Sequence, residues 1–128
     1  QVATASRDKT AKVYDVTSGK RVSTFSGHPE SVRAVDFHSN GREVLSSGDH
    51  GHLFLWRIED GRKIADRAKF EGPILRFLHG GKGLFVSAPG GVVVQFNPED
   101  HKRLREFKIE PPEGTEVPII SSLAAHGR

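Results

Sequence analysis

The sequence predicts an all-β fold in which one four-stranded antiparallel unit occurs three times. Short segments rich in β-branched and aromatic residues, such as residues 53–56 and 92–96, are separated by turns rich in Gly, Asn and Asp. Similar segments return after about 40 residues along the 128-residue chain. No window shows the pattern of a long amphipathic helix. The fold class therefore follows from strands, turns and a repeat.

Two sets of equivalent residues mark the repeat. Aromatic residues that end similar strands stand 42 and then 40 residues apart: Tyr14, Trp56 and Phe96. Small polar residues stand 42 and then 41 apart: Thr4, Ser46 and Ser87. Four short strands per unit at this period are typical of propeller blades. The predicted units span residues 1–42, 43–83 and 84–128, each cut at the turn between its first and second strands.

The repeat resembles that of the WD40 β-propeller family. In unit two, Gly27-His28 leads into the strand SVRAVDF, and LFLW ends at Trp56. Unit one has the run SRDKT from Ser6, close to the family's S-x-D-x-T pattern, followed by AKVYD. Unit three is degenerate, with Phe96 in place of Trp. The resemblance implies three WD40-type blades that form part of a larger or trans-assembled propeller.

In this family a His, a Ser or Thr, an Asp and a Trp form a hydrogen-bonded network that links the strands of a blade. The resemblance places His28, Ser46 and Trp56 in three of these roles in unit two. The Asp position is held by His50, and Asp49 could replace the acid only if the hairpin shifts by one residue. The network of unit two is therefore expected to be altered.

The networks of the other two units are expected to be less complete. Unit one keeps Thr4, Asp8 and Tyr14 in the corresponding roles, whereas the matching His would lie before Gln1. Unit three keeps only Ser87. The stack is therefore expected to depend more on apolar packing than on these polar contacts.

The resemblance also predicts how the blades are completed. It has the chain begin just before a second strand and stop just after a first strand. Closed propellers have about four to eight blades, so three blades cannot close a ring. Either the chain is a segment of a longer propeller, with seven blades the leading expectation, or several copies associate. In the second case a strand at residues 119–125 of one copy completes the blade begun by residues 2–6 of another.

Family positions on the rim of the central channel predict the partner-binding residues. Carried over, they are Arg7, Ser31, Arg33 and Asp49. The alternative is that these are ordinary solvated loop residues. Because Arg is a favoured anchor in protein interfaces, the two arginines are the stronger candidates.

Several kinds of chemistry find no support in the sequence. The chain has no cysteine, which excludes disulfides, thiolate metal sites and a cysteine nucleophile. His50 and His52 alternate onto one side of a strand, but no acid at a telling spacing completes a metal site. The glycine-rich residues 80–83 lack the Ser or Thr of a phosphate-binding loop after Lys82. We therefore expect no cofactor, no metal and no catalytic residue.

These observations predict a non-catalytic protein-interaction scaffold that binds partner proteins through exposed loops. The alternatives are a structural or sensor propeller domain of a larger bacterial signalling or cytochrome-fused protein, and a self-assembling fragment. Partners are expected to be proteins and further blades, from the same chain or from other copies. A net charge of +3 does not favour nucleic acid, and we expect no membrane partner. The lack of cysteine fits a cytoplasmic location.

Overall fold

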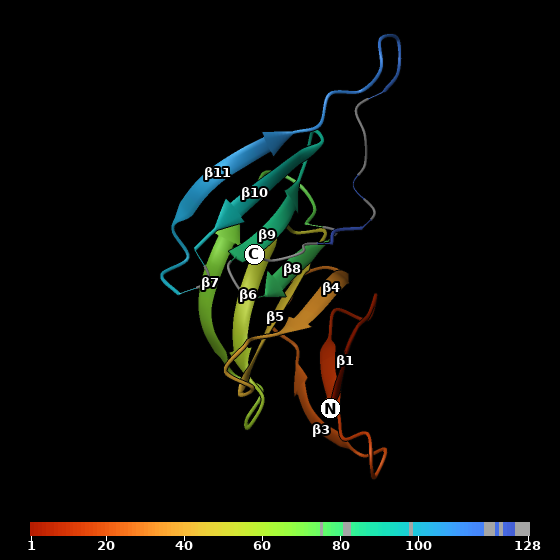
Figure 1. The fold of residues 1–128 in the computed structure, drawn as a ribbon. Helices are drawn as coiled ribbons and strands as arrows, with labels where there is room; N and C mark the ends of the chain where they lie inside the picture. Colours follow the sequence, from red (N-terminus) through yellow and green to blue (C-terminus); the bar gives the residue numbers. More distant parts are fainter. Residues whose placement is uncertain (75, 81–82, 98, 117–119, 121, 125–128) are drawn as a thin grey trace.

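The computed structural model describes residues 1–74, 76–80, 83–97, 99–116, 120 and 122–124. These residues form eleven strands arranged in three antiparallel sheets, and the described ranges contain no helix (Figure 1). The predicted all-β class and the blade-like units are therefore confirmed. No described segment is a helix long and apolar enough to cross a membrane.

Each sheet is built from strands that are consecutive in the chain and pair in sequence order. The first sheet contains β1 (Val2–Ala5), β2 (Ala11–Tyr14) and β3 (Arg21–Phe25). The second contains β4 (Val32–Phe37), β5 (Glu43–Gly48), β6 (His52–Arg57) and β7 (Lys63–Lys69). The third contains β8 (Phe77–Gly80), β9 (Gly83–Ala88), β10 (Val92–Phe96) and β11 (Arg103–Lys108).

The hairpin between β5 and β6 requires a glycine at its tip. Gly51 has a φ of +75°, a conformation that residues with a Cβ rarely adopt. A Cβ built at this position would lie 2.2 Å from the carbonyl oxygen of Phe70, so a side chain cannot fit. The close approach fixes the hairpin against the segment that follows β7, because the amide of Phe70 also donates to the Gly51 carbonyl at 2.9 Å.

Two predictions fall wholly or partly on undescribed residues. β8 ends at Gly80 and β9 begins at Gly83, while Gly81 and Lys82 of the predicted turn lie outside the described residues. Of the strand expected at residues 119–125, only residue 120 and residues 122–124 are described, and they form no strand. Because the expected strand pairs with another copy of the chain, it stays a prediction. Leu123 and Ala124 line an apolar pocket on the third sheet together with Phe85, Val93 and Phe107.

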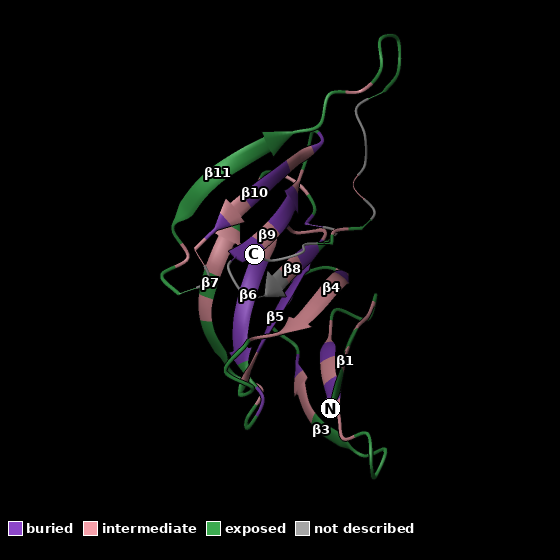
Figure 2. Ribbon diagram, viewed as in Figure 1, coloured by how far each residue is buried: buried purple, intermediate pink, exposed green. Residues whose placement is uncertain are grey.

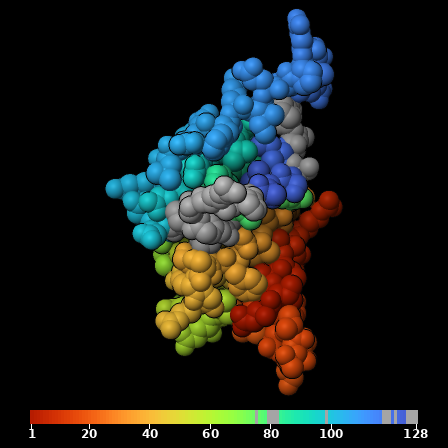
Figure 3. Space-filling model, viewed as in Figure 1, coloured from red at the N-terminus to blue at the C-terminus, as the bar shows by residue number. Residues whose placement is uncertain are grey.

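The core lies between neighbouring sheets, which follow one another along the molecule (Figures 1 and 3). Alternate side chains of β6 point to opposite faces. Phe54 and Trp56 belong to the cluster shared with the first sheet, whereas Leu53 and Leu55 belong to the cluster shared with the third. β5 and β6 are consequently the most completely buried strands of the molecule, whereas β11 is exposed along its length (Figure 2).

A repeated backbone hydrogen bond joins each sheet to the next at one end. The amide of Val32 donates to the carbonyl of Ser6 at 3.0 Å, linking the first sheet to the second. The amide of Ile74 donates to the carbonyl of Gly48 at 3.0 Å and links the second sheet to the third in the same way. Ser6 directly follows β1 and Gly48 is the last residue of β5, and these two strands hold equivalent places in the repeat. Successive sheets are therefore joined at equivalent points.

Replacing Trp56 with Ala is expected to lower the free energy of unfolding by about 3–5 kcal/mol, because the change leaves a large cavity in the core. The Trp56 side chain is 0% exposed. Urea denaturation followed by circular dichroism measures this loss.

The matched control for Trp56→Ala is Leu104→Ala on β11, where the side chain is 55% exposed. This control is expected to change stability by about 0.5 kcal/mol or less. Equal effects of the two substitutions would contradict the described packing of the central blade.

Candidate functional site

The predicted rim residues lie at the end of the sheets where the loops after β1 and β5 meet the start of β4. The amide of Asp49 donates to the carbonyl of Ser31 at 3.1 Å, and this contact lies beside the Ser6–Val32 link between the first two sheets. These backbone contacts bring together residues that are far apart in the sequence. The residues assembled here are Arg7, Ser31, Arg33 and Asp49.

Arg33 and Asp49 form a two-pronged ion pair across the β4–β5 hairpin. Arg33 Nε donates to Asp49 Oδ1 and Nη2 donates to Oδ2, both at 2.8 Å. Hydrogen bonding from Arg33 is the main reason that the pKa of Asp49 lies below its usual value, and the positive charge of Arg7 adds to the effect. Asp49 is therefore an ionised partner of Arg33. The hairpin shift that would have made it the missing acid of the network has not occurred.

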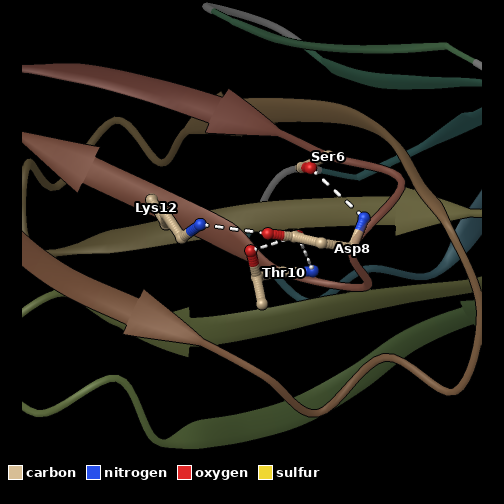
Figure 4. A network of polar contacts seen from close by, with 4 residues as sticks. All are labelled: Ser6, Asp8, Thr10 and Lys12. Atoms are coloured by element: carbon tan, nitrogen blue, oxygen red, sulfur yellow. Dashed lines mark hydrogen bonds and ion pairs between the residues drawn. The ribbon is translucent and has the colours of Figure 1, made fainter.

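The turn that carries Arg7 is held by hydrogen bonds to the Asp8 carboxylate (Figure 4). Asp8 Oδ1 accepts from the Thr10 amide at 3.0 Å and from Thr10 Oγ1 at 2.5 Å, and Oδ2 accepts from Lys12 Nζ at 3.1 Å. The bond from the Thr10 hydroxyl contributes most to lowering the pKa of Asp8 well below its usual range. Arg7 itself is exposed on this turn.

The other network residues predicted in unit one do not come together. The recorded partners of Asp8 are all within four residues of it: Ser6, Thr10 and Lys12. Thr4 on β1 is exposed, and no side-chain hydrogen bond joins it to Asp8 or Tyr14 in the described part of the chain. The reason is that Thr4 alternates with Ala3 and Ala5, which pack toward the second sheet, so its side chain points to the opposite face, which no described strand covers.

In the second sheet, by contrast, a chain of short polar contacts runs through the blade. His28 Nδ1 lies 2.5 Å from His50 Nε2, and His28 Nε2 lies 2.6 Å from Ser46 Oγ. Trp56 Nε1 donates to the same serine oxygen at 3.0 Å. His28 and Ser46 are 3% and 0% exposed, so the chain is shielded from water. His50 thus occupies the place that an Asp holds in the family pattern.

One backbone contact determines which way the protons point along this chain. The amide of His52 donates to His50 Nδ1 at 3.0 Å, so that nitrogen carries no proton. Neutral His50 must then donate from Nε2 to His28 Nδ1, and neutral His28 must donate from Nε2 to Ser46 Oγ. A carboxylate at position 50 could only accept. The substitution of His for Asp therefore reverses the direction of the hydrogen bonds.

Burial keeps both histidines of this chain neutral. Burial, with smaller contributions from the neighbouring His50 and His52, lowers the pKa of His28 to about 3. Burial is also the main reason that the pKa of His50 lies below its usual value. A proton added to either ring would place a donor against another donor, because both nitrogens of each ring are already in hydrogen bonds.

Sequence reasoning did not find two further contacts of this region. His52 Nδ1 lies 2.6 Å from Asp66 Oδ2 on β7, which extends the polar chain toward the surface. The alternation of His50 and His52 suggested that their rings share a side of the strand, and their centroids lie 5.3 Å apart. In the described ranges, no three His, Cys, Asp or Glu side chains are grouped so that they could hold a metal ion.

The second missed contact concerns Arg76, which lies next to the rim. It directly precedes β8, and its Nη1 lies 3.5 Å from the carbonyl oxygen of Arg33. Its backbone is held by Ser87, whose hydroxyl donates to the Arg76 carbonyl at 2.8 Å and accepts from its amide at 3.0 Å. Unit three has Glu71-Gly72 where the family pattern has Gly-His, so this arginine was left unmarked in the sequence.

The stacked sheets define a β-propeller built from repeated blades, and comparison with known proteins agrees. The family model "WD domain, G-beta repeat" matches residues 19–57. In solved structures, the fold is similar to the WD40 β-propeller domain of Doa1, with a TM-score of 0.72 and 18% identity over 83% of this chain and 36% of that chain. It is also similar to the computationally designed Ika8 protein, with a TM-score of 0.68 and 22% identity, over 82% of this chain and 32% of that one.

Relatives in sequence are WD40 proteins as well. Nuclear distribution protein PAC1-1 of Uncinocarpus reesii is 31% identical over 88% of this chain and 22% of its own length. Transcription initiation factor TFIID subunit 5 of Caenorhabditis elegans is 35% identical over 73% of this chain and 15% of its own length. The chain belongs to the WD40 repeat family. It spans about a fifth of the length of these curated relatives.

The buried histidines are expected to make the protein less stable in mild acid. The pKa of His28 is lower in the folded chain than the ordinary 6.5, so the unfolded chain binds more protons at low pH. The contribution of neutral His28 to the free energy of unfolding is complete above about pH 6.5 and is lost progressively as the pH falls toward 3. Urea denaturation should show a loss of about 2 kcal/mol between pH 7 and pH 5.

The variant His50→Asp isolates the cause of this acid sensitivity. A carboxylate at position 50 can accept a hydrogen bond from a protonated His28 Nδ1. The loss of stability between pH 7 and pH 5 should therefore fall to less than half of the loss in the parent protein. The control, His38→Asp, places the same new acid in the turn between β4 and β5, away from the polar chain. If both variants keep the full acid sensitivity of the parent, the assignment to His28 and His50 is wrong.

Proposed function

We propose that this chain is a non-catalytic protein-interaction scaffold that binds partner proteins through the rim loops. The observation that carries the proposal is the meeting of the loops after β1 and β5 with the start of β4 at one end of the sheets. They supply the four predicted rim residues: Arg7, Ser31, Arg33 and Asp49. The backbone contacts that join these loops, together with the Arg33–Asp49 ion pair, hold the rim in a fixed arrangement. A preformed surface binds at a lower entropic cost than a mobile one.

The similar proteins support this role in general terms. One relative is named as a subunit of a transcription initiation factor, and so takes part in an assembly. Within the rim, the arginines are the expected anchors, because Arg is enriched among the residues that dominate binding energy in interfaces. A cytoplasmic location and the absence of a nucleic-acid partner stay predictions.

The rim proposal is tested by site-specific photo-crosslinking. The crosslinking amino acid benzoylphenylalanine, placed at Ser31, is expected to capture partner proteins in an extract of the cells that make the protein. The same amino acid at Arg62, on the exposed turn between β6 and β7 at the other end of the blade, is the control. Equal or stronger capture at position 62 would argue against the rim as the binding surface.

A second proposal, that further blades from the same chain or from other copies cover the third sheet, rests on its outer face. Phe85 and Val93 hold the places in this sheet that Leu45 and Leu53 hold in the second, where both leucines are 0% exposed beneath the next sheet. Phe107 beside them on β11 is 42% exposed. Leu123 and Ala124 cover this face only in part, and the apolar surface that remains exposed on it indicates an interaction surface.

Light scattering on the purified chain tests whether other copies cover this face. The expected result is a discrete oligomer, and Phe107→Lys should shift its mass toward that of the monomer, because a buried charge disfavours the contact. The control Val16→Lys changes an apolar residue that is 67% exposed in the turn after β2 and should leave the mass unchanged. A parent chain that is monomeric at all concentrations would exclude association through this face.

A further inference from the structure

We propose that the rim binds an acidic segment of the partner protein, an extended stretch rich in Asp and Glu. Arg7 and Arg76 supply the charge that attracts it, and the Arg33–Asp49 pair forms the fixed centre between them. The inference rests on the proposed scaffold function and adds the chemistry of the partner to it.

The first argument is the convergence of three arginines from three different sheets. Arg7 lies on the turn after β1, Arg33 lies on β4, and Arg76 directly precedes β8. The backbone link from Ser6 to Val32 places the first beside the second, and Arg76 Nη1 lies 3.5 Å from the Arg33 carbonyl. Arg7 is also close enough to Asp49 to act on the pKa of its carboxyl group.

The second argument is the local charge balance. Of the acids near the three guanidinium groups, Asp49 is already engaged by Arg33 through both carboxylate oxygens. Asp8 on the Arg7 turn is likewise engaged, by Lys12 and the Thr10 hydroxyl. Glu30 is exposed on the loop before β4 and acts on His50. Arg7 and Arg76 are both exposed, and the side chains of Asp8 and Asp49 are bound to other residues.

The third argument is that arginine recognises carboxylates with a defined geometry. Its planar guanidinium donates two parallel hydrogen bonds to one carboxylate, as Arg33 does to Asp49. Exposed arginines on the first and third sheets match carboxylates spaced along an extended chain better than they match one small anion. The net charge of +3 is small for a protein that binds nucleic acid through many phosphate contacts. These observations favour an acidic protein segment.

Fluorescence anisotropy with defined peptides tests the proposal. The probe is a fluorescein-labelled peptide of alternating Glu and Ser, and the comparison peptide has Gln in place of each Glu. The Glu peptide is expected to bind and the Gln peptide is not. Binding should weaken as salt rises from about 50 to about 200 mM, because the contacts are exposed ion pairs. The double variant R7Q/R76Q is expected to weaken binding about tenfold or more.

The matched control is Arg62→Gln, which removes one exposed arginine from the opposite end of the blade and should leave affinity for the Glu peptide unchanged. Equal binding of the Gln peptide, or no effect of R7Q/R76Q, overturns the proposal. Single-stranded DNA that binds more tightly than the Glu peptide, and through the same arginines, overturns it in favour of nucleic acid.

The outcome also separates this inference from the function on which it rests. If the Glu peptide fails to bind while crosslinks at Ser31 persist, the proposal of an acidic partner segment is wrong and the proposed scaffold function stands. If crosslinks at Ser31 are absent as well, both are wrong.

Discussion

Burial of β6 on both faces is the constraint on which the rest of the structure depends. Phe54 and Trp56 pack toward the first sheet, and Leu53 and Leu55 pack toward the third. A strand that is apolar on both sides can reach a low free energy only between two other sheets. Stacking of the blades is therefore a requirement of this strand, and the loops at the ends of the sheets take their positions from it.

The polar chain through the second blade has to be compatible with that burial. Ser46 lies beneath Trp56 with no access to water, so its oxygen must be satisfied inside the blade. His28 and His50 do this as neutral rings that each donate and accept one hydrogen bond. In the family pattern the carboxylate of an Asp stands at the position of His50. In this chain the network instead depends on both histidine rings remaining neutral.

Much of this fold and part of its candidate site could be predicted, because the relevant signals lie in spacing. Trp56, Ser46 and His28 sit at family intervals, and the structure places them within hydrogen-bonding distance. The pairing of Arg33 with Asp49 depends on the register of β4 and β5, which no local pattern reveals. Arg76 was missed because unit three lacks the motif that fixes the register.

The links from Ser6 to Val32 and from Gly48 to Ile74 have a mechanical consequence. Both bonds join neighbouring blades at the same end of the sheets, the end that carries the rim residues. The tilt between the blades is set by these bonds at the rim end together with the apolar clusters between the sheets and the close approach of Gly61 to the Thr24 carbonyl at the other end. A molecule that binds all of the rim arginines would lie across both of these links, and its binding would help to hold the curvature of the stacked blades.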